Sequence, residues 1–196
     1  LTATALLPFL VLPLSGVMDA NDTASAYYSP TLFLILGGAF IALAIERTNL
    51  HCRLALGILQ QLGQGGGSTR LLLAFMIATA LLSTLISNTS TALIMMPMAL
   101  AVLATQESDA APAGGTTGRQ DGLSGALPLG IAFAASIGGL GTIVGSPTNA
   151  IAVGMLDTLI GVRIGFAQWM AFGIPVVLLG IPLTAWIIGK VQKVAD

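Results

Sequence analysis

Charged residues are scarce in this 196-residue sequence: Asp, Glu, Lys and Arg make up 8% of it, against roughly 25% in ordinary globular domains. Hydrophobic residues make up 55%, and the mean hydropathy is +0.93. The formal net charge is −1 and Lys and Arg form no basic patch, which excludes a groove for nucleic acid. The single cysteine, Cys52, excludes an internal disulfide and a multi-cysteine metal site. The composition therefore predicts an integral membrane protein.

The few charges leave five long uncharged runs, which are residues 1–18, 23–45, 71–106, 122–156 and 164–189. Each run is long enough to cross, or to enter deeply, a hydrocarbon core that needs about 20 apolar residues. Because helices satisfy their own backbone hydrogen bonds in lipid, we predict an all-α, multi-span helical bundle. The sequence begins inside an apolar run without Met or a basic leader, so we expect it to be a fragment of a longer protein.

Two of these runs contain polar and small residues that are unusual at membrane depth. The triplet Ser87-Asn88-Thr89 stands in the middle of residues 71–106. Residues 122–156 are interrupted by Gly138-Gly139-Leu140-Gly141-Thr142 and then by Gly145-Ser146-Pro147-Thr148-Asn149. Non-helical backbone survives at membrane depth only where it is buried in protein or lines a wet cavity. The two passages therefore predict two broken membrane elements, which are the places where transporters bind ions and anions.

The distribution of Lys and Arg favours a re-entrant hairpin over a single crossing for residues 71–106. With a hairpin, six basic residues share one face and only Arg163 lies on the other, as the cytoplasmic bias of basic residues predicts. A single crossing would leave four basic residues inside and three outside. The six that the hairpin places together are Arg47, Arg53, Arg70, Arg119, Lys190 and Lys193.

This threading divides the chain into five parts of a multi-pass protein of the plasma (inner) membrane. The predicted parts are scaffold-type membrane helices with a cytoplasmic interfacial helix (1–62), a re-entrant hairpin (68–105), a cytoplasmic loop (106–123), a discontinuous transmembrane helix (124–157) and a final span (164–190). Residues 46–70, 106–123 and 190–196 are predicted to be cytoplasmic.

The two breaks offer neutral oxygen ligands for a cation and hydrogen-bond donors for an anion. A helix that stops leaves unpaired N–H groups at one broken end and unpaired C=O groups at the other. The N–H end attracts anions, and the carbonyl end attracts cations. Sodium is a hard cation, and by analogy with other hard cations it favours oxygen ligands such as hydroxyls, amide carbonyls and backbone carbonyls. The predicted sodium-binding residues are Ser83, Ser87, Asn88, Gly138, Gly141, Thr142 and Gly145, and the predicted substrate-binding residues are Asn88, Thr89, Ser146, Pro147, Thr148 and Asn149.

Neither break contains Asp, Glu, Lys or Arg, so a bound anion would meet donors and dipoles instead of a salt bridge. Because burying an unpaired anion costs many kcal/mol, a bound cation is the expected compensation. We therefore predict that cation and anion binding are coupled, with Na+ as the coupling ion and no organic cofactor.

Three other functions stay open at this point. The first is another broken-helix ion transporter of the arsenite or sodium/proton type, although proton exchange normally needs intramembrane carboxylates. The second is a non-transporting membrane anion sensor. The third is an intramembrane enzyme with Ser87 as nucleophile, which would need an adjacent base. The one histidine, His51, is expected at the cytoplasmic surface, so we predict no catalytic residue.

The motifs also resemble a known family. Leu85 to Thr91, followed by Ile94-Met95-Met96-Pro97, resembles the first hairpin tip of the divalent anion:sodium symporter family. Ala135 to Gly139, leading to residues 145–149, is similar to that family's unwound fifth membrane helix. The resemblance covers nearly the whole chain but only the N-terminal half of a family member, which is the first of two inverted repeats.

The resemblance implies a sodium-coupled symporter of C4-dicarboxylates, citrate or sulfate that works as a homodimer by an elevator-type movement in the lipid bilayer. It implies a first sodium site lined by Ser83, Ser87, Asn88 and the glycine-rich break at 138–145. It further implies that Asn88 and Thr89 touch a substrate carboxylate. The sequence departs from the family at residues 146–148, which are Ser-Pro-Thr where Thr-Pro-Pro is frequent, so a hydroxyl is retained and one proline is lost.

Overall fold

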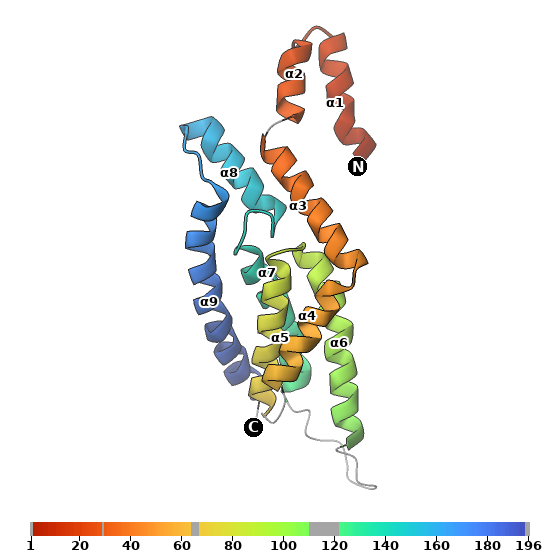
Figure 1. The fold of residues 1–196 in the computed structure, drawn as a ribbon, viewed down its shortest axis with the longest axis vertical. Helices are drawn as coiled ribbons and strands as arrows, with labels where there is room; N and C mark the ends of the chain where they lie inside the picture. The colour runs from red at the N-terminus through yellow and green to blue at the C-terminus, as the bar shows by residue number, and fades with distance from the viewer. Residues whose placement is uncertain (1, 29, 64–66, 110–121, 195–196) are drawn as a thin grey trace.

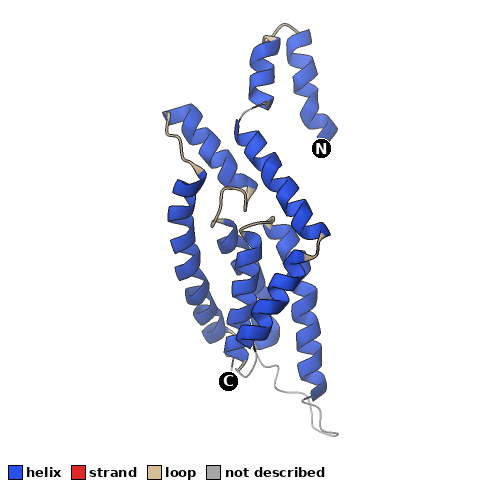
Figure 2. Cartoon of the chain, in the orientation of Figure 1, coloured by secondary structure: helices blue, strands red, loops and turns tan. Residues whose placement is uncertain are grey.

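The computed structural model describes residues 2–28, 30–63, 67–109 and 122–194, and the regular structure within these ranges is helical (Figure 2). The helices are α1 (Thr2–Leu14), α2 (Ala20–Tyr27), α3 (Pro30–Arg47), α4 (Leu50–Gly63), α5 (Ser68–Ser83), α6 (Asn88–Asp109), α7 (Leu123–Gly139), α8 (Pro147–Ile160) and α9 (Phe166–Val191). The predicted all-α bundle is confirmed for this part of the chain. Most of the predicted loop at 106–123 lies outside the described residues.

Several of these helices are apolar enough for a membrane. By length and composition, Ala20–Arg47, Asn88–Thr105 and Phe166–Val191 could each cross one. The shorter apolar helices are Ala3–Leu14, Ser68–Ser83 and Leu123–Gly139. At 1.5 Å per residue, a helix of this length reaches at most about 25 Å, less than the roughly 30 Å of a hydrocarbon core. Two of these short helices, α5 and α7, are each too short to cross such a core alone. They end next to the two polar passages of the sequence.

Helices α5 and α6 form a hairpin whose turn is residues 84–87 (Figure 1). The Ser87 hydroxyl accepts a hydrogen bond from the Ser90 N–H at 3.2 Å, and the Ser87 carbonyl accepts one from the Thr91 N–H at 2.9 Å. A serine in this position satisfies an otherwise unpaired N–H of the first helical turn. The sequence placed the tip at residues 87–89, but α6 already begins at Asn88. The turn lies about three residues earlier because Ser87 caps the helix.

Helices α7 and α8 are separated by a non-helical break at residues 140–146. The end of α7 tightens, with the Leu140 N–H bonded to Ile137 O at 3.1 Å and the Gly141 N–H to Gly138 O at 2.9 Å. Pro147 is the first residue of α8, where its missing N–H would be unpaired anyway. In the structure the break is shorter than the predicted 138–149, because α7 continues to Gly139 and α8 already begins at Pro147.

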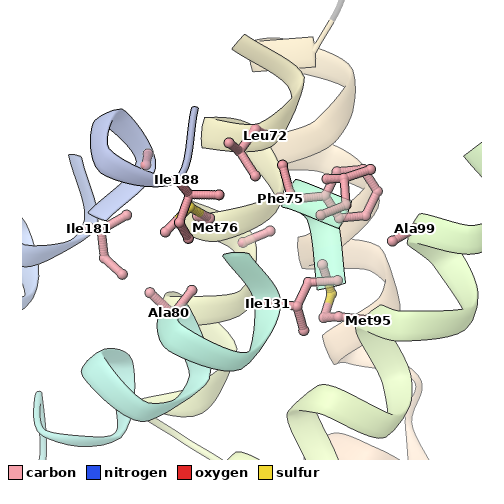
Figure 3. Packing of buried hydrophobic residues seen from close by; sticks show 14 of the residues in the cluster. Leu72, Phe75, Met76, Ala80, Met95, Ala99, Ile131, Ile181 and Ile188 are labelled. Atoms are coloured by element: carbon pink, nitrogen blue, oxygen red, sulfur yellow. The ribbon is translucent and has the colours of Figure 1, made fainter. Parts of the chain in front are cut away.

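The hydrophobic core is centred on α5, which has nine buried residues covering most of its circumference, while Leu81 on the remaining face is 45% exposed. A helix that is apolar all round is typically enclosed by its neighbours. Figure 3 shows side chains of α5, α6, α7 and α9 meeting in this core, with Leu72, Phe75, Met76, Ala80, Met95, Ala99, Ile131, Ile181 and Ile188 labelled. Small residues let the helices approach closely: a Cβ added at Gly130 of α7 would lie 2.8 Å from Leu72 Cδ1. Helix α5, the first arm of the hairpin, therefore packs closely against α7.

Helix α4 was predicted to lie in the cytoplasmic interface, and one of its faces packs on α5 instead. Ala55 is fully buried, and Ile58 and Leu59 pack against the core cluster. His51, expected at the surface, is 5% exposed, with its Nδ1 3.2 Å from Ile45 O. The i, i+4, i+7 and i+8 spacing of these four residues explains the shared face. Residues 54 and 56 stay exposed, so an interfacial position for the other face stays a prediction.

Several helix ends lie together toward one end of the long axis of the molecule (Figure 1). The start of α5, the ends of α6 and α9 and the start of α7 lie toward this end, and the α8–α9 connection lies toward the other, whose tip is the α1–α2 connection (Figure 1). That connection carries Arg163, whose Nε lies 3.1 Å from Asp157 Oδ1 in an exposed ion pair. The hairpin turn and the helix break lie between the two ends, which brings the interrupted segments together (Figure 2).

Candidate functional site at the hairpin turn and the helix break

Thr142 joins the hairpin turn to the helix break. Its hydroxyl donates to the Thr84 carbonyl oxygen at 2.6 Å and accepts from the Gly145 N–H at 2.9 Å. The side chain is buried, with 7% of Thr142 exposed. One hydroxyl thus pairs a carbonyl of the turn and an N–H of the break, and both groups would otherwise be buried without a partner. The predicted sodium residue Thr142 therefore has a structural task.

Ser83 and Asn88 form the polar centre of the site. The Ser83 hydroxyl, which is fully buried, lies 2.7 Å from Asn88 Oδ1 and 2.7 Å from the Ala135 carbonyl oxygen. A hydroxyl has one proton to donate, so two oxygens compete for it. The Asn88 amide nitrogen has no hydrogen-bond partner within the described ranges. Asn88 as a whole is half-buried.

Two glycines, Gly139 at the end of α7 and Gly145 in the break, lie directly against this centre. A Cβ added at Gly139 would meet Asn88 Oδ1. A Cβ added at Gly145 would lie 2.6 Å from Gly139 O and 2.9 Å from Ser83 O. The absence of side chains at Gly139 and Gly145 brings two backbone carbonyls and the Ser83–Asn88 pair into one neighbourhood. This neighbourhood, made of Ser83, Asn88, Gly139 and Gly145, is called the oxygen cluster below.

Asn149 holds the carbonyls of the break in place. Its Nδ2 donates to Gly139 O at 2.7 Å and to Thr142 O at 2.9 Å, and 4% of the residue is exposed. Both of its donor protons are therefore engaged within the protein. The neighbouring hydroxyls of Ser146 and Thr148 lie 2.7 Å apart, and Thr148 is exposed. They stand at the first turn of α8, where unpaired N–H groups favour negative charge.

The structure thus brings most of the predicted residues to one place, with different tasks. Gly138 packs against the backbone of Ala80, and a Cβ added at Gly141 would lie 2.8 Å from Thr84 Cγ2. The Ser87 hydroxyl caps α6 and lies 3.0 Å from Ser90 Oγ, and no described contact joins it to the oxygen cluster. Thr89 is exposed beside Asn88.

Other residues of the site were missed from the sequence. The Thr84 and Ala135 carbonyls accept hydrogen bonds across the site, and Trp169 Nε1 of α9 donates to Leu140 O at 2.9 Å. Backbone carbonyls carry no sequence signal. The Trp169 contact joins residues 29 apart in sequence, so no local pattern predicts it. Gly139 lay inside the glycine-rich passage and could have been included on that ground.

An apolar cavity of about 450 Å³ lies beside the site between α5 and α9, and Thr84, Gly141 and Thr142 form part of its wall. Its other lining residues are Ile77, Ala80, Leu81, Met170, Ile174, Val177, Leu178, Ile181 and Pro182. Such walls cannot compensate the charge of a carboxylate. This cavity therefore does not suit an anion.

The electrostatic potential at the site comes from the dipoles of backbone and neutral side-chain groups, because neither break contains Asp, Glu, Lys or Arg. Within the described residues, no group of three His, Cys, Asp or Glu side chains could hold a metal ion. A cation at the oxygen cluster would be bound by neutral oxygens, which suits a weakly held, hard monovalent ion.

A bundle of apolar helices in which a hairpin turn meets a helix break is typical of a membrane transporter. The chain belongs to the citrate transporter family (CitMHS), whose family model matches residues 1–196. The family membership assigns the chain to transporters and not to enzymes. It also confirms the resemblance seen in the Ser-Asn-Thr and Gly-Ser-Pro-Thr-Asn motifs.

Curated relatives point to the same class. The chain is 41% identical to the sodium-dependent dicarboxylate transporter SdcS of Staphylococcus saprophyticus over 182 residues, which is 91% of this chain and 34% of the relative. It is 40% identical over 183 residues to the protein of the same name from Staphylococcus aureus strain USA300, which covers 92% of this chain and 35% of the relative. The chain spans about a third of the length of these curated relatives.

The Thr142 bridge predicts a measurable stability difference. Thr142→Val removes the hydroxyl but keeps the shape, leaving Thr84 O and the Gly145 N–H unpaired. Unsatisfied buried groups cost about 1–3 kcal/mol each, so we expect unfolding to become easier by roughly 2–4 kcal/mol. Thermal unfolding in detergent measures this. Thr142→Ser, which keeps the hydroxyl, should stay close to wild type, and equal loss in both variants would contradict the bridge.

Proposed function

We propose that the complete protein is a sodium-coupled symporter of divalent organic anions, such as C4-dicarboxylates or citrate, with sulfate as a further candidate. The observation that carries the proposal is the oxygen cluster, in which Ser83 and Asn88 of the hairpin face Gly139 at the end of α7 and Gly145 of the break. The family and the names of the relatives support the same function.

The sodium site lies at the oxygen cluster. Its oxygens are Asn88 Oδ1, the Ser83 hydroxyl and the carbonyls of Ser83 and Gly139. A bound cation would draw Asn88 Oδ1 and leave the Ser83 proton to the Ala135 carbonyl, which already lies at 2.7 Å. The remaining predicted residues shape the site: Gly138 and Gly141 allow close packing, Thr142 ties the two elements, and the Ser87 hydroxyl caps α6.

The anion site lies next to the sodium site. The free amide nitrogen of Asn88 and the exposed hydroxyl of Thr89 supply donors from α6. Ser146 and Thr148 supply hydroxyls at the start of α8, and Pro147 sets the direction of that first turn. Helix N-termini favour anions through their unpaired N–H groups. Asn149, the last predicted residue, supports this site by holding the Gly139 and Thr142 carbonyls.

Sodium and anion binding are coupled because neither break contains an ionisable side chain. An unpaired carboxylate in this half-buried setting is costly, and so is an unpaired cation. Each ion lowers the cost of binding the other when the two sit side by side. The coupling therefore follows from the attraction between the two bound ions and needs no separate conformational change.

The remaining parts of the proposal concern the whole molecule. We place α5 and α6 as a re-entrant hairpin opening to the cytoplasm, with residues 46–70, 106–123 and 190–196 on that side of the plasma (inner) membrane. The common end shared by the outer ends of α5, α6 and α9 supports this placement (Figure 1). A homodimer, a second inverted repeat and an elevator-type movement are what the family resemblance implies for the complete protein.

Reconstitution of the complete reading frame into liposomes tests the function. Uptake of labelled succinate, citrate and sulfate is measured with an inward sodium gradient and with potassium in its place. We expect accumulation of a divalent anion that requires sodium and that collapses in potassium. Equal uptake in potassium would contradict sodium coupling, and sodium-dependent binding without uptake would identify an anion sensor.

A further inference from the structure

The carbonyl oxygens at the end of α7 are held one after another by different parts of the chain. Ile137 O and Gly138 O accept from the N–H groups of the tightened helix end, at 3.1 and 2.9 Å. Gly139 O accepts from Asn149 of α8 at 2.7 Å. Leu140 O is the next in the series, and its partner comes from α9. The break is therefore restrained by three separate helices.

Two residues of α9 meet the Leu140 carbonyl. Trp169 Nε1 donates to Leu140 O at 2.9 Å. Gly173 lies one helical turn further on, and a Cβ added there would meet Leu140 O and lie 3.2 Å from Gly141 O. Residues four apart share a face of a helix. One face of α9 thus packs closely on the break at Gly173, which has no side chain, and donates a hydrogen bond to it from the Trp169 indole N–H.

We infer that Trp169 is a positioning residue that sets the affinity for sodium by holding the Leu140 carbonyl. This inference rests on the proposed function. Trp169 touches neither ion; it acts on the break, which carries the Gly139 carbonyl of the oxygen cluster.

The physical reason is the freedom of the chain on either side of Leu140. Gly139 and Gly141 lack a Cβ, so their backbone angles are weakly restricted. The Leu140 carbonyl belongs to the peptide group that connects this residue to Gly141, and an external donor that holds it limits rotation of that group about the Leu140 Cα–C and Gly141 N–Cα bonds. When only part of the population has the competent conformation, the apparent dissociation constant rises in inverse proportion to that fraction. Loss of the Trp169 bond would therefore weaken sodium binding without removing a ligand.

The surroundings of Trp169 allow this bond to be tested by substitution. The indole is half-buried beside a cavity of about 270 Å³ that Leu140, Phe172 and Val176 also line. A smaller ring in this position fills less space and overpacks nothing.

The experiment measures sodium activation of anion uptake in the complete protein, at saturating succinate or citrate, for wild type and Trp169→Phe. One hydrogen bond is worth about 1 kcal/mol, so we expect the half-saturating sodium concentration to rise roughly fivefold. The maximal rate at saturating sodium should not change. The melting temperature without sodium should stay near wild type, and the stabilisation caused by sodium should shrink.

Trp186→Phe is the matched control on the same helix. Trp186 is 59% exposed and its ring lies 4.7 Å from Lys190 Nζ, away from the break. A second variant replaces Trp169 by 3-benzothienylalanine, in which sulfur takes the place of the N–H and the ring keeps its shape. It keeps the test decisive if phenylalanine weakens folding.

The outcomes separate this inference from the proposed function. A wild type that transports without sodium dependence would overturn both. A sodium-dependent wild type whose two Trp169 variants show the same half-saturating sodium as Trp186→Phe would overturn the positioning role alone. A fall in melting temperature without a change in sodium activation would do the same, because it would show a purely structural contact.

Discussion

Asn88→Ala should reduce sodium-dependent anion uptake by more than about 100-fold at limiting sodium and substrate, since an oxygen ligand for sodium and a hydrogen-bond donor to a charged anion, at about 1.5–3 kcal/mol each, are lost together. Its Oδ1 is the oxygen that faces Ser83 and Gly139, and its amide nitrogen is free for an anion. Initial rates of labelled succinate or citrate uptake into liposomes measure the effect. Unchanged uptake with unchanged sodium dependence would show that the site lies elsewhere.

Asn88→Asp separates the two tasks of this residue. An aspartate keeps an oxygen for sodium but loses both amide protons and adds a negative charge next to the anion. We therefore expect sodium still to stabilise this variant against heat while anion binding is lost. Asn21→Ala, at the exposed start of α2, is the control for general effects of removing an asparagine. A variant with normal anion affinity would contradict the placement of the substrate donor.

Gly138→Ala should destabilise the protein by roughly 3 kcal/mol, the upper part of the range for overpacking a tight contact. The added Cβ would lie 2.5 Å from Ala80 Cα and 2.8 Å from Ala80 C. These are backbone atoms of α5 in its buried part, so the contact cannot be relieved by moving a flexible side chain. The two helices would have to separate next to the oxygen cluster. Thermal unfolding in detergent and the yield of folded protein measure the effect.

Gly57→Ala in α4 and Gly189→Ala in α9 are matched controls, because a Cβ added at either position meets nothing within 4 Å. Alanine is favoured over glycine within helices by about 0.5–1 kcal/mol, so these variants should be neutral or slightly more stable. A Gly138→Ala protein as stable as these controls would mean that α5 and α7 are not packed as closely as the structure shows.

The class of protein and the two interruptions followed from local chemistry. Long uncharged runs can lie in lipid as helices, because a helix satisfies its own backbone hydrogen bonds. Within such helices a Ser-Asn-Thr triplet and a run of Gly, Ser, Pro and Asn are visible as exceptions without any knowledge of the fold. Pro147 marks a helix start for the same local reason, and the structure has α8 beginning there.

The positions of the helix ends were less predictable from sequence. The turn of the hairpin was expected at residues 87–89. In the structure the Ser87 hydroxyl satisfies the Ser90 N–H, and α6 begins at Asn88, directly after Ser87. The interfacial helix at residues 51–62 was predicted from its apolar positions 54, 56, 58, 59 and 62 with polar residues between them, and the burial of His51 was missed. In each case the outcome depended on which neighbour supplied a hydrogen bond or a packing surface.

The sequence by itself determined that this chain is a helical membrane protein of a transporter family with two neutral, oxygen-rich interruptions, because composition and helix breaking act over a few residues. Only the tertiary structure decided what each polar group does. Ser83 meets the Ala135 carbonyl 52 residues away, Thr142 meets Thr84 58 residues away, and Trp169 meets Leu140 29 residues away. Such pairings depend on how α5, α7 and α9 pack, and backbone carbonyls, which accept most of these bonds, are the same in every residue type.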